Sequence, residues 1–210
     1  IASIFLTNEF LHLWRSCVSF FKPKKTNLSI MNTKSEKEKF LLLSGEFAAV
    51  ASEYNHFLEK TRETDLKNFL TTSHKLLSLL YLKALLLPDA RNYNSDDIEK
   101  FVTEEEWNYI KTVVNLKIKS LDPYDPEADL IPGKKPVENT TISEDLTDIY
   151  QDTKDFTSLF NMGVYEMIYD AVGECKNNFK MYWGIKALNA MKTLHKLMMK
   201  DDKDLDEISD

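Results

Sequence analysis

The sequence contains few of the residues that interrupt helices or build disulfide frameworks. Its 210 residues include 5 glycines, 6 prolines and 2 cysteines. Cys17 and Cys175 lie far apart in the sequence and match no metal-binding spacing. Without a disulfide framework, a reducing, cytoplasmic location is expected.

The chain also lacks the short motifs that identify common catalytic sites. It has no glycine-rich phosphate loop, no nucleophile elbow and no His-Glu metal motif. No two of its histidines, His12, His56, His74 and His195, have ligand spacing on one helix. His195 follows Met191 by one helical turn, where a structural or capping role is expected. We therefore predict no catalytic residues and no cofactor.

Charge and hydrophobic patterning narrow the possible fold class and the possible partners of the protein. Hydrophobic residues make up 43% of the sequence, but the valine–isoleucine alternation that is typical of strands is absent, which favours an all-α fold. The formal net charge of -7 argues against nonspecific nucleic-acid binding, because such binding requires Lys and Arg to neutralise phosphates. We expect another protein as the partner, and no nucleic acid.

The longest apolar stretch runs from Leu76 to Pro88, with the sequence LLSLLYLKALLLP. Only Ser78 and Lys83 are polar before the proline, and the stretch is too short for a membrane span, which needs about 20 apolar residues. A helix of this kind must be covered on nearly every side. We therefore predict that Asp65–Leu87 is the central helix of a single-domain, all-α bundle of about five helices.

Apolar periodicity predicts the buried side of this helix and places the other helices. A stripe recurs at alternating steps of four and three: Leu66, Leu70, Ser73, Leu77, Leu80, Ala84 and Leu87. Leu80 lies in the middle of the stripe and should be fully enclosed. The other predicted helices are Glu36–Lys60, Glu104–Leu121, Ser143–Asn161 and Val164–Lys200, the last broken near Asn177 or Gly184.

Capping signals mark several helix ends. Thr103 and Glu106 fit a capping box, in which each side chain accepts from the other residue's amide. Ser143 is predicted as the N-cap of its helix, and Gly163 marks the end of that helix. A short helical turn is predicted over Ile98–Val102.

The predicted bundle occupies residues 31–200, and two segments inside or beyond it differ in composition. The stretch 122–141 contains four prolines and Gly133, so no helix can cross it. A loop of this length is a lid, a binding loop or a disordered segment, or else a surface crossover packed by Tyr124, Leu130 and Ile131, which we favour. Residues 201–210 form an acidic tail.

Residues 1–30 are predicted to be an extra segment that is not part of the fold. In one interpretation, residues 1–21 form an amphipathic helix that touches a membrane surface or the bundle. In the other, which we favour, translation begins at Met31. We expect no membrane contact unless residues 1–21 are a real amphipathic segment.

Four aspartates in the stretch SEDLTDIYQDTKDF, Ser143–Phe156, are the main functional candidates. Asp145, Asp148, Asp152 and Asp155 recur at steps of three, four and three, which places them along one side of a helix. One interpretation is a site for a divalent cation, which takes oxygen ligands, with Asp148 and Asp152 as candidate metal ligands. The other, which we favour, is a solvated face that forms salt bridges with lysines.

Aromatic side chains lie in the same part of the sequence. Tyr150, Tyr182 and Trp183 are predicted to cluster where the last two helices pack against each other. Core packing is their expected role, and a pocket between the helices is the alternative.

Three segments carry a resemblance to a known family: SEDLTDIYQDTKDF, the central LLYLKALLLP, and ECKNNFKMYWGIKALNAMKTLH at Glu174–His195. Over about Glu36–Met199 the chain resembles an uncharacterised bacterial family, domain of unknown function number five-zero-six-three. The resemblance implies an all-helical, cytosolic protein of Bacteroides-type bacteria. It implies no activity, cofactor or catalytic residue, but it points to the DIYQD and YWG segments as the place of a family-specific role.

Together these observations favour a non-catalytic interaction or adaptor module. A carboxylate-metal-dependent hydrolase that acts on a nucleotide or phosphoester is the alternative. The candidate binding surface consists of Asp145, Asp148, Tyr150, Gln151, Asp152, Asp155, Tyr182, Trp183 and His195.

If residues 1–30 are not part of the fold, a chain shortened to begin at Met31 should unfold at the same temperature as the full chain. Thermal unfolding followed by circular dichroism measures this. A decrease of several degrees would show instead that the segment packs on the bundle.

Overall fold

The computed structural model describes residues 28–90, 98–126 and 140–200. The chain divides into two units, Ile1–Lys39 and Phe40–Asp210, and the packing below concerns the second unit. The described residues contain helices and a single isolated bridge between Pro123 and Thr141, but no strand. The predicted all-α bundle is confirmed.

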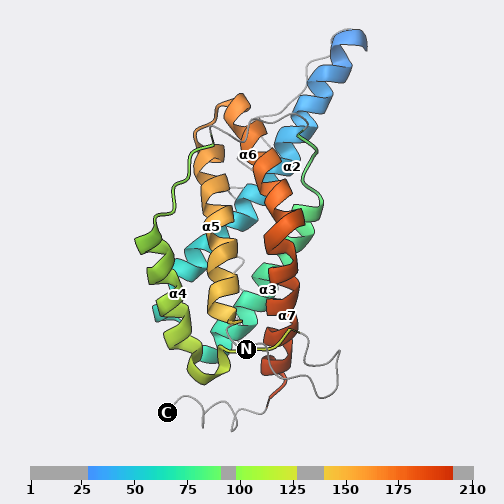
Figure 1. The fold of residues 1–210 in the computed structure, drawn as a ribbon. Helices are drawn as coiled ribbons and strands as arrows, with labels where there is room; N and C mark the ends of the chain where they lie inside the picture. The colour runs from blue at the N-terminus through green and yellow to red at the C-terminus, as the bar shows by residue number, and fades with distance from the viewer. Residues whose placement is uncertain (1–27, 91–97, 127–139, 201–210) are drawn as a thin grey trace. The chain divides into compact units, whose positions relative to one another are not determined.

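The helices are joined by short turns and by the segments that flank the gaps in the description (Figure 1). Their bounds are α2 Leu28–Glu59, α3 Leu66–Leu85, α4 Glu104–Ile118, α5 Ile142–Asn161, α6 Tyr165–Asn178 and α7 Gly184–Met198. A π-helical turn, η3 Phe179–Trp183, connects α6 directly to α7. The predicted last helix is therefore interrupted between the two positions that the sequence indicated.

Several helix ends follow the sequence signals. Both hydrogen bonds of the Thr103–Glu106 capping box are present at the start of α4. Gly163 follows α5 with a φ of 74°, a left-handed conformation that glycine adopts without strain. The first helix, by contrast, was predicted to begin near Glu36, whereas α2 begins at Leu28 and is continuous through Met31.

The N-cap of α5 is Thr141, so the prediction of Ser143 was wrong. The Thr141 hydroxyl accepts from the Glu144 amide at 3.2 Å. Ser143 is instead held by the buried side chain of Asp122, which accepts from the Ser143 amide at 2.7 Å and from its hydroxyl at 2.6 Å. Asp122 thus satisfies a free amide of the first helical turn from outside the helix.

The two described ends of the proline-containing stretch lie against each other. The Tyr124 amide donates to the Thr140 carbonyl, and the Ile142 amide donates to the Asp122 carbonyl, both at 3.0 Å. Tyr124 also packs against the core, as predicted for a crossover. Leu130 and Ile131, which were predicted to pack with it, lie outside the described residues.

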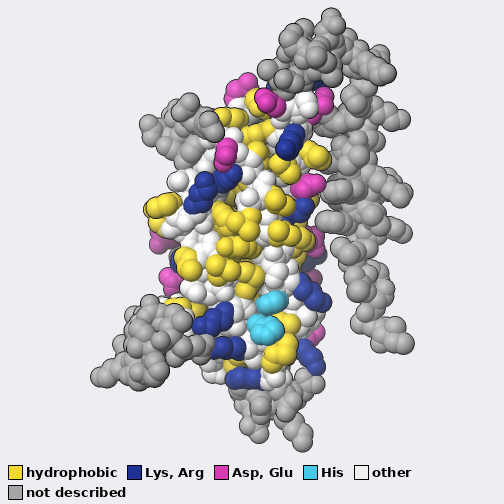
Figure 2. Space-filling view, turned by 90° about the vertical axis from the view of Figure 1, so that its right-hand side faces the viewer, with side chains coloured by type: hydrophobic (Ala, Val, Ile, Leu, Met, Phe, Trp, Pro, Cys, Tyr) yellow, Lys and Arg dark blue, Asp and Glu magenta, His cyan; other side chains and the backbone are white. Residues whose placement is uncertain are grey.

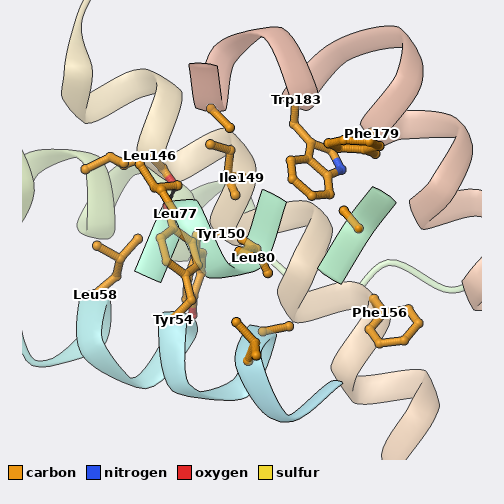
Figure 3. Close-up of a cluster of buried hydrophobic side chains, with 14 of the residues drawn as sticks. Tyr54, Leu58, Leu77, Leu80, Leu146, Ile149, Tyr150, Phe156, Phe179 and Trp183 are labelled. Carbon is orange, nitrogen blue, oxygen red and sulfur yellow. Dashed lines mark hydrogen bonds between the residues drawn. The ribbon is translucent and has the colours of Figure 1, made fainter. Parts of the chain in front are cut away.

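The core of the second unit is centred on α5, which packs against α4, α6, η3 and α7. Figure 3 shows side chains of α2, α3 and α5 meeting the aromatic rings of η3. Leu80 lies in this cluster with no exposed surface, as predicted. Most of the predicted stripe on α3 is buried with it, while Leu66 is partly buried.

The prediction that this apolar helix is covered on nearly every side was wrong. On α3 and at its end, Leu79, Leu82, Leu85 and Leu86 are 40%, 51%, 56% and 49% exposed, respectively. The helix packs mainly against α7, so one of its sides has no neighbour among the described residues.

Truncation of Leu80 should be far more destabilising than truncation of Leu82. Leu80→Ala removes buried methyl groups and leaves a cavity, which should lower the free energy of unfolding by about 2–5 kcal/mol. Leu82→Ala, at a side chain that is 51% exposed, should change it by about 0.5 kcal/mol or less. Urea unfolding of the two variants measures the difference, and equal effects would contradict the packing described here.

Candidate functional site

A pocket of about 480 Å³ lies where α5 meets the junction of α6, η3 and α7. We call it the α5 pocket. It is lined by Lys100, Asp148, Gln151, Asp152, Asp155, Asn178, Tyr182, Trp183 and Lys186. Six of these residues belong to the candidate surface predicted from the sequence, so the structure brings the DIYQD and YWG segments together.

The four aspartates of α5 do not form the solvated face that the charge pattern favoured. Asp145 and Asp155 are each only 4% exposed, and Asp148 and Asp152 are partly buried. A buried carboxylate is unfavourable unless hydrogen bonds or ion pairs compensate for the lost hydration. Each aspartate indeed has donors from other segments of the chain.

Asp155 is held by the segment that precedes α4. Its Oδ1 accepts from the backbone amides of Phe101 and Val102 at 2.7 and 3.1 Å. Lys100 Nζ lies 3.9 Å from its Oδ2 and 3.1 Å from Oε1 of Glu174. These contacts explain why the predicted helical turn over Ile98–Val102 is absent: the amides bind a carboxylate instead of helical carbonyls.

Asp148 and Asp145 share one lysine of α7. Lys186 Nζ lies 2.5 Å from Asp148 Oδ2 and 3.5 Å from Asp145 Oδ1. The indole N–H of Trp107 donates to Asp148 Oδ1 at 2.9 Å, and the Tyr124 hydroxyl donates to Asp145. Burial raises the pKa of the Asp145 carboxyl, although the hydroxyl and the ammonium group both act in the opposite direction.

Asp152 is different, because no lysine or arginine of the described residues forms an ion pair with it within 4.0 Å. Its Oδ1 accepts from Asn178 Nδ2 at 2.7 Å. Burial raises the pKa of Asp152 from its ordinary value of 3.8 to about 6, and the Asn178 hydrogen bond and the charge of Lys100 only partly offset this effect. Asp152 is therefore the carboxylate of the α5 pocket whose charge is least compensated.

The π-helical turn supplies the aromatic side of the pocket. Trp183 is 1% exposed and Tyr182 is 63% exposed, so one ring is enclosed and the other reaches solvent. The amide of Gly184 donates to the Phe179 carbonyl, and a Cβ at Gly184 would lie 2.4 Å from that carbonyl oxygen. Glycine is thus needed here for a close approach within the π turn. Such turns are frequent at functional sites.

Three predicted residues do not line the pocket: Asp145, described above, Tyr150 and His195. The Tyr150 hydroxyl donates to Glu59 of α2 at 3.0 Å, which fits its expected core role. His195 lies at the other end of α7, with its ring centroid 5.8 Å from that of His74 on α3. Histidine spacing within one helix does not predict this pair, because its members come from neighbouring helices.

The described residues contain no group of three or more His, Cys, Asp or Glu that could hold a metal ion. Asp148, one of the two candidate metal ligands, already accepts from Lys186 and Trp107. The other candidate, Asp152, accepts from Asn178. Both candidate carboxylates thus accept hydrogen bonds from donors of the protein itself.

The family model described as "Domain of unknown function (DUF5063)" matches residues 40–200. The chain belongs to this family. The match confirms the resemblance that was carried by the DIYQD, YWG and central leucine segments, and it includes every residue of the α5 pocket.

A solved structure has a similar fold. This DUF5063 protein is similar to protein BF1032 from Bacteroides fragilis, whose crystal structure superposes with a TM-score of 0.64 and whose sequence is 36% identical. The similarity covers 75% of this chain and 92% of that chain. The search of curated proteins gives no match. Among the described helices, none combines the length and the apolar character needed to cross a membrane.

Sequence reasoning missed three lining residues of the DUF5063 pocket: Lys100, Asn178 and Lys186. Lys186 follows Tyr182 by one helical turn, so the YWG segment gave a signal for it. Asn178 precedes Tyr182 by the same number of residues and lies in the Glu174–His195 segment, so a signal existed for it as well. Lys100 gave no such signal, because it is brought to α5 by tertiary packing.

The variant Asp152→Asn should gain stability relative to the wild type as the pH rises from about 4 to 7. The pKa of about 6 in the folded protein lies above that of the unfolded chain, so the native state binds more protons in this interval. The stability of the wild type therefore falls as Asp152 ionises. Asparagine cannot ionise and is free of this loss.

Thermal unfolding at pH 4.5 and pH 7.5 measures the difference between the two proteins, with Glu166→Gln at an exposed site on α6 as the matched control. If Asp152→Asn is instead less stable at the higher pH, the carboxylate must have a cationic partner in the folded protein.

Proposed function

We propose that this DUF5063 domain is a non-catalytic interaction module that binds an amphipathic helix of another protein along α3 and α7. The observation that carries the proposal is an exposed apolar face on these two helices and on η3. Its residues, which we call the apolar face, are Leu79, Leu82, Leu85, Leu86, Met181, Ile185 and Leu188. Each is at least 40% exposed.

The two halves of the apolar face lie on neighbouring helices. Ser78 Oγ on α3 is 3.3 Å from Met191 Sδ on α7. The ring centroids of Tyr81 on α3 and Phe179 in η3 are 5.0 Å apart. Figure 2 shows hydrophobic side chains gathered on this side of the molecule, next to the two histidines. Contiguous apolar surface of this kind, bordered by polar residues, is typical of protein interaction sites.

Charge around the face indicates the chemistry of the partner. Lys75 of α3 is next to His74, and Lys192 and Lys196 flank His195 on α7. Figure 2 shows Lys and Arg side chains around the histidines at this end of the apolar face. A helix with apolar residues at i, i+3, i+4 and i+7 and with acidic residues at one end is complementary to such a surface.

The hydrolase alternative has less support. It requires carboxylates that are available to a metal, whereas Asp148 and Asp155 accept from lysine, indole or backbone donors. The interaction module requires only the exposed leucines, isoleucine and methionine that are present.

A synthetic amphipathic peptide with Glu at one end should bind the full chain, and the same peptide with Lys in place of Glu should bind more weakly. Fluorescence anisotropy of a labelled peptide measures both affinities. Ile185→Ser should reduce the affinity for the acidic peptide, whereas Leu116→Ser on α4, at a leucine that is 62% exposed, should leave it unchanged.

Three results would count against the proposal: equal binding of the two peptides, equal effects of the two substitutions, or a dimer in solution that Ile185→Ser dissociates. The last would identify a second copy of this chain as the occupant of the apolar face.

A further inference from the structure

We propose that the α5 pocket binds a small organic cation, a primary aliphatic amine, with the Asp152 carboxylate as its counter-ion. The inference is independent of the proposed helix-binding face, because the two sites use different residues. The α5 pocket has a volume of about 480 Å³, which is in the range of pockets that bind small molecules.

The charge of the lining selects a cation. Lys100 and Lys186 are the two basic residues that line the pocket. Both are already paired, Lys100 with Glu174 at 3.1 Å and Lys186 with Asp148 at 2.5 Å. An anionic ligand would have to compete with these carboxylates, so the pocket disfavours phosphate or carboxylate ligands.

Asp152 provides the complementary group. Its Oδ1 accepts from Asn178, and no donor from the described residues is bonded to Oδ2. A partly buried carboxylate with a free acceptor and no ion pair is stabilised by a ligand ammonium group, which forms a charge-assisted hydrogen bond. Its raised pKa is consistent with this lack of compensation.

The aromatic residues of the π turn form another side of the binding site. Tyr182 reaches solvent beside the pocket, where its ring face can attract an ammonium group. Trp183 also lines the pocket, is 1% exposed, and has an indole N–H without an acceptor among the described residues. Because the Trp183 ring lies at the pocket, its indole N–H signal can report on a ligand bound there.

The test uses three small probes of similar size and different charge: 4-aminobutan-1-ol, the neutral 1,4-butanediol and the anion 4-hydroxybutyrate. Each is titrated into the full chain at pH 7.5 and constant ionic strength. Nuclear magnetic resonance follows the indole N–H signals, and Trp183 is assigned with Trp183→Phe. We expect the amino alcohol to shift the Trp183 signal with saturation, and the diol and the anion to produce no saturable shift.

Variants then locate the site. Asp152→Asn should weaken binding of the amino alcohol by about tenfold or more, because a charged hydrogen bond is lost. Tyr182→Leu, at an exposed position, should weaken it by about two- to fivefold. Glu166→Gln, at an exposed site on α6 and absent from the lining, should leave it unchanged.

The proposal is overturned if the diol or the anion binds as well as the amino alcohol, or if Asp152→Asn retains full affinity. A magnesium titration tests whether the pocket binds a metal ion instead of an amine. If Mg²⁺ binds with dependence on Asp152 and the amino alcohol does not bind, the pocket is a metal site and the inference fails. If Asp152→Asn does not fold, Tyr182→Leu decides: unchanged affinity in that variant also overturns the proposal.

Discussion

The burial of the acidic side of α5 is the constraint on which much of this domain depends. The helix has an apolar stripe that enters the core and, beside it, four aspartates of which two are almost fully enclosed. Burial of charge on this scale requires compensation from several directions. The donors come from the segment before α4, from α4 itself, from the Pro-rich crossover and from α7. Each of these elements is thereby held at α5 by polar contacts as well as by apolar packing.

The helices could be predicted from the sequence because their signals are local. The capping box at Thr103, the left-handed Gly163 and the buried stripe through Leu80 all depend on spacing within one helix. The break between α6 and α7 was also indicated, but its π-helical character was not. It depends on a close approach at Gly184 that no spacing rule describes.

The environment of the aspartates could not be predicted in this way. Spacing placed Asp145, Asp148, Asp152 and Asp155 on one side of a helix, but it contained no information about what faces that side. The decisive donors, such as Lys186 and the amides of Phe101 and Val102, lie dozens of residues away in the sequence. The exposed side of α3 was missed for a related reason. An apolar sequence shows that burial of the helix would be favourable. It does not show whether the chain has another helix that packs on that side.

The π turn also sets how two surfaces of α7 are oriented. A π turn holds one more residue than the α-helical turn it replaces, so every later side chain is rotated about the helix axis relative to α6 by roughly 100°. Lys186 faces the aspartates of α5, while Ile185 and Leu188 are exposed to solvent. Loss of one residue from Phe179–Trp183 would restore a regular helix and turn both surfaces at once. The length of this five-residue segment is therefore under a constraint that substitutions alone do not reveal, and insertions or deletions there are expected to be excluded within the family.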